Sequence, residues 1–367
     1  MNLHWVVPGP LDQLTGGYLY DRQMIDQLRT QGHVVVVHEL AGRFPEPDER
    51  AKLAAAEVLD RVSASSLLII DGLALPAFAG RLHLAQAPVL ALVHHPLAIE
   101  RALNGEAGGI SAEHEQALWR QVASFICPSQ QTRRAVMAAG IDGVLIETVH
   151  PGLQLPEQRR WRSSRTPRRM LCVAIVVPRK GHMLLLAALA GLRTYDWRLD
   201  CIGSLQRDPA HVRRVRAQRQ RLRLRDRVHL HGEVSPAMLR QAYHRADLFV
   251  LPSYHEGYGM ALAEAIAAGI PVISTRAGAI PEAVAPGAGV LVAPADVQAL
   301  RLALQSLWRQ PDHYRRLCRG AWRGARHYRS WRQAGAEFAA ALMKLDTRIR
   351  GQGSGDQLGQ GRRNGTL

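Results

Sequence analysis

The sequence of 367 residues has few cysteines, and they lie far apart along the chain. They form no CxxC pair, and no histidine cluster has the spacing of a metal site. Disulfide frameworks and structural zinc sites are usually signalled by closely spaced cysteines. We therefore expect neither a disulfide nor a metal centre from Cys127, Cys172, Cys201 and Cys318.

Long apolar runs are also absent. None reaches the roughly 18 residues needed to span a bilayer, and the opening MNLHWVVPGP lacks the basic region and apolar core of a signal peptide. The length predicts two domains of roughly 150 to 200 residues, and a hydrophobic content of 47% is enough for two cores. We expect a cytoplasmic protein with two domains.

Lysine is scarce, since 44 of the 47 basic residues are arginine, but the formal net charge is +16. Such a charge favours an anionic partner, which could be nucleic acid, acidic lipid or a nucleotide. No zinc finger, RNP-like aromatic strand or basic heptad array accompanies the charge, so we expect no nucleic-acid partner. The arginine-rich segment 211–227 has two readings: a solvated helix face, or peripheral contact with an anionic membrane.

The chain alternates between short apolar segments with strand character and helical segments. Repeated β-α-β units predict parallel, doubly wound sheets. A polar, arginine-rich stretch interrupts the alternation, which then restarts, so the chain reads as two Rossmann-like halves in series. We predict a first domain at 1–156, a linker at 157–169, a second domain at 170–330, a helix at 331–349 and a disordered tail at 350–367.

The segment 248–275 carries the strongest functional signal. It reads as a strand, a glycine turn, a helix beginning at Met260 and a second strand. Free N–H groups at such a helix start form a natural seat for a phosphate at the carboxyl edge of a sheet. Glu256 in the loop and Glu264 in the helix can therefore face one ligand from different sides.

The string VLPSYHEGYGMALAEAIAAGIPVISTRAGAIPEAV resembles the signature of the retaining glycosyltransferases of family 4 (group 1), which have the GT-B fold. The resemblance covers most of the chain and is strongest from about Arg179 to Ala293. It implies an α/β protein of two Rossmann-like doubly wound domains facing across a cleft, with a C-terminal helix crossing back to the first domain. It also implies an acceptor domain followed by a nucleotide-sugar donor domain.

The segment PRKGH contains the basic residues expected to contact the donor. Lys180 matches the lysine that family members aim at the donor diphosphate, where developing charge needs cationic or N–H donors. Many members also place an arginine shortly before this lysine in a GR dipeptide. Here those positions are Ala174 and Ile175, so Arg179 is the candidate substitute.

The resemblance assigns the two glutamates to the donor. Glu256 would bind hydroxyls of the transferred sugar and Glu264 the ribose hydroxyls, and ionised carboxylates are acceptors suited to such hydroxyl pairs. The remaining donor-binding candidates are backbone groups and loop residues: Gly257, Tyr258, Gly259 and Met260 around the helix start, and Gly203, Ser204, Gly232, Glu233 and Val234 in two neighbouring loops.

Two further sets of candidate site residues lie in the predicted first domain. Thr15, Gly16 and Gly17 match the glycine-rich loop that family members bring over the donor diphosphate. His94 and His95 end an apolar segment where the family places a histidine near the reacting sugar carbon, and the sequence does not choose between them. With Glu256 and Lys180 they complete the predicted catalytic set.

The sequence has no Asp-x-Asp motif, which agrees with the metal-independent chemistry typical of GT-B enzymes. The resemblance implies transfer of a sugar with retention of configuration, with the nucleotide-sugar as co-substrate, no further cofactor, and a role in cell-envelope or glycan biosynthesis. The acceptor is not identified. Two alternatives stay open: a protein that binds nucleotide-sugars without turnover, and a sugar-nucleotide epimerase.

Overall fold

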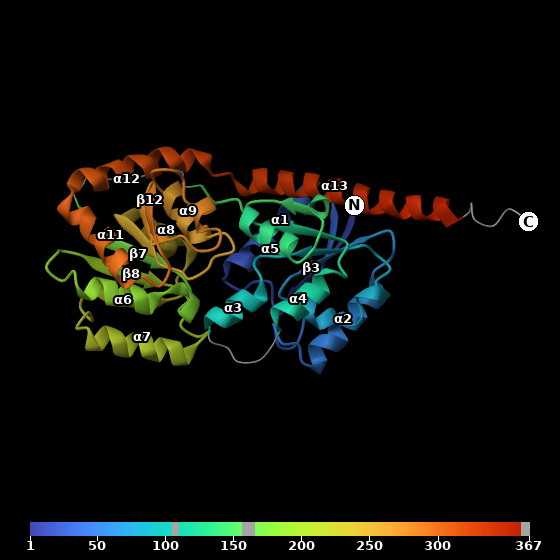
Figure 1. The fold of residues 1–367 in the computed structure, drawn as a ribbon, viewed down its shortest axis with the longest axis horizontal. Helices are drawn as coiled ribbons and strands as arrows, with labels where there is room; N and C mark the ends of the chain where they lie inside the picture. Colours follow the sequence, from blue (N-terminus) through green and yellow to red (C-terminus); the bar gives the residue numbers. More distant parts are fainter. Residues whose placement is uncertain (105–109, 156–165, 361–367) are drawn as a thin grey trace, which may run out of the picture. The chain divides into compact units, whose positions relative to one another are not determined.

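The computed structural model describes residues 1–104, 110–155 and 166–360 (Figure 1). The chain forms two compact units. Unit 1 consists of Met1–Ile99, Ala107–Pro151 and Trp331–Leu367, and unit 2 of Glu100–Glu106 and Gly152–Ser330. Most of the predicted linker, residues 157–165, lies outside the described residues.

Unit 1 contains a parallel sheet of six strands in the order β2-β1-β3-β4-β5-β6. The order reverses between β1 and β3, and the crevice beyond the carboxyl ends of strands at such a point is where open α/β sheets bind ligands. The strands are β1 (Asn2–Pro8), β2 (Val34–Leu40), β3 (Leu67–Asp71), β4 (Val89–Leu92), β5 (Ser124–Cys127) and β6 (Ile146–Thr148).

Helices cover both faces of this sheet, because alternate residues of its buried strands point to opposite sides. On one face Trp5 and Tyr20 pack with Phe338 of the last helix, and the Trp5 and Phe338 rings are stacked with centroids 5.5 Å apart. The helices and turns are α1 (Gly16–Thr30), α2 (Glu49–Arg61), η1 (Leu75–Phe78), η2 (Leu82–Leu84), α4 (Ala112–Trp119), α5 (Gln130–Ala138), η3 (Gly143–Leu145) and α13 (Trp331–Gln360). Helix α3 (Leu97–Asn104) begins in unit 1 and its residues from Glu100 onward belong to unit 2.

Unit 2 contains a second parallel sheet of six strands, in the order β12-β11-β10-β7-β8-β9. Its order reverses between β7 and β10, which are neighbours in the sheet but are separated along the chain by two other strands. The strands are β7 (Arg169–Val173), β8 (Arg198–Ile202), β9 (Val228–Gly232), β10 (Leu248–Leu251), β11 (Val272–Thr275) and β12 (Gly289–Val292).

One continuous core fills unit 2 on both sides of its sheet. The helix at the signature segment begins at Met260 as predicted. The helices and turns are η4 (Pro178–Lys180), α6 (His182–Ala190), α7 (Pro209–Arg221), α8 (Pro236–Arg245), α9 (Met260–Ala267), α10 (Ile280–Ala283), α11 (Val297–Arg309), α12 (Pro311–Gly324) and η5 (Ala325–His327). The two doubly wound parallel sheets, with the chain returning to unit 1 through α13, confirm the predicted α/β fold class.

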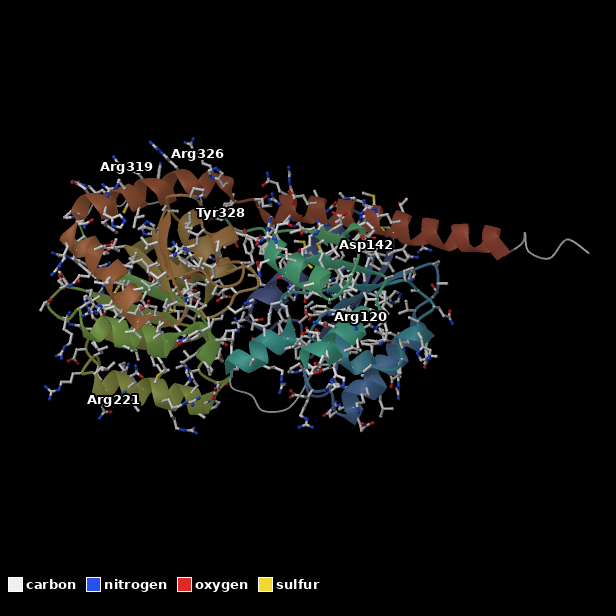
Figure 2. All side chains as sticks on the ribbon, in the orientation of Figure 1. Arg120, Asp142, Arg221, Arg319, Arg326 and Tyr328 are labelled. Carbon is white, nitrogen blue, oxygen red and sulfur yellow. The ribbon has the colours of Figure 1, made fainter. Side chains whose placement is uncertain are left out.

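The arginine-rich segment 211–227 includes most of α7, and its residues divide between core and solvent. Val212 and Val215 are buried, whereas Arg213, Arg216 and Arg221 are exposed. Figure 2 labels Arg221 on this helix and Arg319 on α12, which carries further exposed arginines. The helical part of the segment, 211–221, is therefore amphipathic, with a solvated arginine face.

The last helix is longer than predicted. The sequence places a disordered tail from residue 350, but α13 runs from Trp331 to Gln360, so that prediction is wrong for residues 350–360. A helix already held by packing gains one backbone hydrogen bond for each added residue without a new nucleation cost, so a polar, glycine-containing segment can continue it. Residues 361–367 lie outside the described part of the chain. No helix among the described residues has the length and apolar character needed to cross a bilayer.

Candidate active site

Lys180 and Glu256 meet at the point where the strand order of unit 2 reverses. Lys180 ends the short turn after β7, and Glu256 lies in the loop after β10. The Lys180 Nζ lies 2.7 and 2.8 Å from the two carboxylate oxygens of Glu256. The Ser253 hydroxyl donates a third hydrogen bond, of 2.6 Å, to the same carboxylate. The structure thus brings two predicted catalytic residues into direct contact.

Arg179 adds a second cation to this cluster. Its guanidinium donates to Glu100 at 2.6 and 3.0 Å and to the His255 carbonyl oxygen at 3.2 Å. It also lies 3.8 Å from the Glu256 carboxylate. Arg179 is therefore present at the site, but its fork of donors is already used by protein acceptors.

Burial and charge pairing oppose each other in this cluster. Burial favours the neutral form of the Glu256 carboxyl, but Lys180 and Arg179 outweigh it and lower the pKa of Glu256. Burial lowers the pKa of Lys180, and Glu256 acts in the opposite direction. A charged and hydrogen-bonded pair is the arrangement that permits such groups to be buried. The cluster is thus a largely buried, charged and hydrogen-bonded ion pair.

Two glycines allow the loops of this site to approach closely. Gly181 has φ +72°, and a Cβ there would overlap the carbonyl oxygen of Pro252. Gly278 has φ +54°, and a Cβ there would overlap the backbone of Glu256. L side chains rarely adopt this conformation. The backbone N–H of Tyr254 also donates to the Arg179 carbonyl oxygen at 2.8 Å, which ties the two loops together.

The start of α9 lies directly after this loop. Gly259 precedes the helix with φ +98° and, having no side chain, provides no side-chain cap for the first turn. Glu264 is the fifth residue of α9, and Tyr243 donates a 2.7 Å hydrogen bond to its Oε2. Burial raises the pKa of Glu264, and the Tyr243 hydrogen bond opposes that rise. Tyr258 packs against the side of α9, with Ala263 and Ala267.

The loops after β8 and β9 lie at the same sheet edge. Gly203 has φ +145° and its N–H donates to the Gly232 carbonyl oxygen at 2.9 Å. A Cβ at Gly203 would overlap the carbonyl oxygen of Ala174, so the chain packs backbone against backbone where many family members carry their GR dipeptide. The Ser204 carbonyl oxygen accepts from Val176 N–H at 3.0 Å. Glu233 and Val234 follow Gly232 directly, between β9 and α8.

A second polar centre lies in unit 1, beside the reversal point of that sheet. His94 Nε2 lies 3.2 Å from Asp21 Oδ1 and 3.5 Å from Asp71 Oδ2. The Tyr20 ring meets the imidazole edge to face, with centroids 5.5 Å apart. A Cβ at Gly17 would lie 3.2 Å from His94 Cδ2, so glycine allows the start of α1 to pack against the ring.

The two carboxylates control the charge of His94. Burial alone would lower the pKa of His94, but Asp21 and Asp71 outweigh burial and raise it to about 10. Burial raises the pKa of Asp21 to about 7, whereas hydrogen bonds from His94 and Asp21 offset burial and lower the pKa of Asp71. The imidazole is thus held as a cation at neutral pH, with Nε2 bound to carboxylate.

The predicted residues of unit 1 fall into two groups. Gly17 packs against His94, and Gly16 is the first residue of α1. His95 follows His94 in the chain, and its charge acts on the Glu115 carboxyl. The structure therefore distinguishes the two histidines, which the sequence did not.

Sequence reasoning missed the residues that hold the predicted ones in place. Asp21, Asp71, Ser253, Tyr243 and Glu100 all bind a predicted side chain. Asp71 could have been found, because it ends a buried strand at the edge where ligands bind. Asp21 is an acidic residue within an otherwise apolar helix face, which is a weaker signal.

Two groups of described residues could hold a metal ion: Asp21, Asp71 and His94, and Cys172, His182 and Cys201. Their members are far apart in sequence, so the spacing test applied to the sequence could not detect them. The ion pairs described above account for the first group. The second lies in the core of unit 2, and its His182 follows Lys180 by two residues.

Comparison with known proteins agrees with this geometry. Residues 156–322 match the family model of the glycosyl transferases group 1. The chain is similar to the MMP alpha-(1->4)-mannosyltransferase of Mycolicibacterium hassiacum, with 28% identity over 325 residues, 83% of this chain and 77% of that protein. It is 30% identical over 216 residues to the D-inositol 3-phosphate glycosyltransferase of Corynebacterium glutamicum, 57% of this chain and about half (51%) of that protein.

Solved structures extend the likeness to the whole fold. Sucrose-phosphate synthase from Thermosynechococcus elongatus has a TM-score of 0.80 at 19% identity, covering 95% of this chain and 99% of that one. Anabaena Alr3699/HepE in complex with UDP-glucose has a TM-score of 0.76 at 19% identity, covering 94% and 99%.

The fold and the site thus define an α/β enzyme of the GT-B architecture. Over residues 156–322 the chain is similar to the group 1 glycosyltransferases, as the sequence resemblance indicated.

Proposed function

We propose that the protein is a retaining, metal-independent glycosyltransferase of family 4 that uses a nucleotide-diphosphate-sugar as donor. The observation that carries this proposal is the contact between Lys180 and Glu256 at the point where the strand order of unit 2 reverses. The N-terminus of α9, which has no side-chain cap, follows the Glu256 loop directly. A cation, a carboxylate and a helix N-terminus at one sheet edge suit a ligand that carries both a diphosphate and hydroxyl groups.

Donor binding would rearrange the ion pair. The diphosphate attracts the Lys180 ammonium more strongly than a single carboxylate does, and Glu256 then accepts from the sugar hydroxyls. Ser253 and the backbone of Gly278 and Ala279 hold the Glu256 loop during this exchange, since Ala279 N–H donates to the Glu256 carbonyl oxygen at 2.9 Å. The loop remains fixed and only the side chains change partners.

In the proposed reaction the bond between the anomeric carbon and the diphosphate oxygen breaks, and the acceptor hydroxyl oxygen forms a new bond to the same face of that carbon. The acceptor proton passes to the leaving phosphate oxygen. Lys180 stabilises the negative charge that develops on the diphosphate, which is the interaction most valuable in the transition state. Attack on the face that the diphosphate leaves retains the anomeric configuration.

Glu264 is proposed to bind the ribose. Its Oε2 accepts from Tyr243, which fixes the carboxylate and leaves Oε1 for a vicinal hydroxyl pair. The loops at Gly203 and Gly232 would provide backbone contacts to the base and the phosphates. The complex of Alr3699/HepE with UDP-glucose supports a donor of this type.

His94 is proposed to act as a fixed cation. Because Asp21 and Asp71 bind its Nε2, the ring can donate only from Nδ1, and its raised pKa keeps that N–H in place at neutral pH. It would donate to a substrate oxygen and would not act as a base. Gly17 permits this position of the ring.

The test is calorimetric titration and thermal shift of the full chain against UDP-, GDP- and ADP-sugars, with Glu264→Ala in parallel. A bound donor raises stability in proportion to the logarithm of its concentration over its dissociation constant. We expect one nucleotide class to bind the wild type and to lose at least about tenfold in affinity, or 1.4 kcal/mol, in the variant. A folded protein that binds none of these donors would contradict the proposal.

A donor that binds but is neither transferred nor hydrolysed would favour the second reading, a nucleotide-sugar-binding protein. The specific observation behind that reading is the absence of the GR arginine at Ile175, together with the use of the Arg179 guanidinium by Glu100. Conversion of a nucleotide-sugar without any acceptor would favour the epimerase reading. Product analysis by mass spectrometry and NMR separates the three.

We further propose a cytoplasmic enzyme whose arginine faces meet an anionic membrane while it acts on a lipid-linked or lipid acceptor. The exposed arginines of α7 and α12 motivate this proposal. Sedimentation with vesicles of neutral and of anionic lipid tests it at two salt concentrations. Binding to anionic vesicles alone, weakened by salt, is expected; equal binding to both kinds would contradict it.

A further inference from the structure

Three soft donor atoms converge in the core of unit 2. Cys172 on β7 and Cys201 on β8 are directly paired in the parallel register, so their side chains point to the same face of the sheet. His182, the first residue of α6, reaches them from above that face, with its Nε2 3.9 Å from Cys172 Sγ. One ligand atom from each residue lies within 4.8 Å of the other two.

All three side chains are buried, at 1% exposure for Cys172, 5% for Cys201 and 2% for His182. The Nδ1 of His182 has no hydrogen-bond partner among the described residues. Burying an imidazole with only a long contact to sulfur leaves much of its desolvation cost unmatched. The cavity beside His182 and Cys201 is also lined by Arg219, whose Nη1 donates to the Val228 carbonyl oxygen at 3.0 Å. The other lining residues are apolar: Leu185, Leu186, Leu199, Val215, Val228 and Leu230.

The separations suit a metal ion. Bonds of about 2.3 Å to sulfur and 2.0 to 2.1 Å to imidazole nitrogen place the ligand atoms of a tetrahedral site roughly 3.5 to 3.8 Å apart. The three atoms of this cluster need to move by an ångström or less to reach that arrangement. Two thiolates and an imidazole select thiophilic ions over magnesium or calcium.

We propose that Cys172, His182 and Cys201 bind one thiophilic d10 cation, Zn²⁺ or Cu⁺. The ion would tie β7, β8 and the start of α6 together in the core. His182 follows Lys180 by two residues, so the ion also fixes the end of the turn that carries Lys180. Its effect is on the stability of unit 2, and it takes no part in the transfer reaction.

The experiment begins with the wild-type chain, purified under reducing conditions, stripped with a chelator and titrated with Co²⁺, Zn²⁺ and Cu⁺ separately. Thiolate coordination gives a sulfur-to-cobalt charge-transfer band in the near ultraviolet, and Zn²⁺ or Cu⁺ should displace cobalt at one equivalent. We expect the bound ion to raise the melting temperature. The absence of a charge-transfer band together with no tight Zn²⁺ or Cu⁺ binding would overturn the proposal without any variant.

The variants Cys172→Ala and Cys201→Ala should each lose the band and the metal-dependent rise in melting temperature. Cys127→Ala is the matched control, because it removes a buried thiol from the sheet of unit 1 and should leave both readouts unchanged. Metal binding that survives in both cluster variants would overturn the proposal. A mass deficit of two hydrogens in the unreduced wild type, mapped to Cys172 and Cys201, would replace it with a disulfide.

Discussion

The Lys180 ammonium lies 2.7 Å from the nearer carboxylate oxygen of Glu256, although these residues belong to loops 76 positions apart in the chain. The loops meet because β7 and β10 are neighbours at the point where the strand order reverses. Each side chain is buried beside the other, with exposed fractions of 14% and 9%. In the proposed reaction, this pair supplies both the cation that stabilises the diphosphate and the carboxylate that binds the sugar.

Replacing Lys180 by Met should separate these roles. The change removes the charge near the diphosphate, and we expect turnover to fall by about 10²- to 10³-fold, the usual effect of losing one transition-state donor. It also leaves Glu256 buried with Arg179 3.8 Å away as the nearest remaining cation. We therefore expect a loss of roughly 3 kcal/mol in the free energy of unfolding, measured by urea denaturation.

Lys52→Met is the control for that variant. Lys52 also contacts a carboxylate, that of Glu49, at 2.7 Å, but its side chain is 44% exposed and that of Glu49 is 82% exposed. Exposed pairs contribute about 0 to 1 kcal/mol, so stability and turnover should stay near the wild-type values. Equal effects of the two substitutions would mean that the Lys180 pair has no special role.

Substitution of Gly181 tests the close approach of the two loops. A Cβ at Gly181 meets the Pro252 carbonyl oxygen in addition to the strain of a positive φ, whereas Gly140 has φ +88° with nothing within 4 Å of its Cβ position. Gly140→Ala should therefore cost only the left-handed strain of about 1 to 2 kcal/mol. Gly181→Ala should cost clearly more and reduce donor affinity. Equal losses in the free energy of unfolding would show that the Pro252 contact relaxes freely.

The Tyr243 and Glu264 pair predicts a graded effect on donor binding. Glu264→Gln removes the charge from the proposed ribose acceptor, whereas Tyr243→Phe removes only the hydrogen bond that holds it. We expect donor affinity to fall more in the first variant than in the second, measured by calorimetry. Because the pKa of Glu264 is raised by burial, the wild-type affinity should also weaken as the pH is lowered. Tyr243→Phe removes the hydrogen bond that lowers this pKa. The donor affinity of that variant should therefore begin to weaken at a higher pH than that of the wild type.

The charge of His94 predicts a pH dependence of stability. Its pKa is raised from the ordinary 6.5 to about 10, so the folded state binds a proton more tightly than the unfolded state does. The stabilisation is fully present below pH 6.5 and is lost as the pH rises through 10. His94→Gln should therefore lower the free energy of unfolding more at pH 7.5 than at pH 10, measured by urea denaturation at each pH. A constant difference across this window would mean that the imidazole is neutral in the folded protein.

The fold was largely predictable from local patterns. Apolar runs such as Leu248–Leu251, followed by glycine and then a helix-forming segment, predict β-α-β units. Because crossovers between parallel strands are right-handed, few sheet topologies remain possible. The predicted helix begins at Met260, directly after Gly259. The end of the last helix was not predictable, because a polar composition excludes a packed core but does not exclude a helix that continues from a packed start.

The side-chain contacts were harder to predict from the sequence. Lys180 and Glu256 were predicted separately, but their pairing depends on two strands being adjacent in the sheet and not in the chain. The aspartates that bind His94 come from α1 and β3, and the three residues of the Cys172 cluster come from two strands and a helix. Spacing rules detect ligands within one loop, so they failed for groups assembled by the sheet topology.

The most direct test of the central claim compares a nucleoside diphosphate with its monophosphate, using the base found in the donor panel, in wild type and Lys180→Met. If Lys180 binds the diphosphate, the wild type should prefer the diphosphate by at least about tenfold, or 1.4 kcal/mol. The variant should lose most of that preference while still binding the monophosphate. An undiminished preference for the diphosphate in a folded Lys180→Met protein would contradict the assignment of Lys180 and of the site built around it.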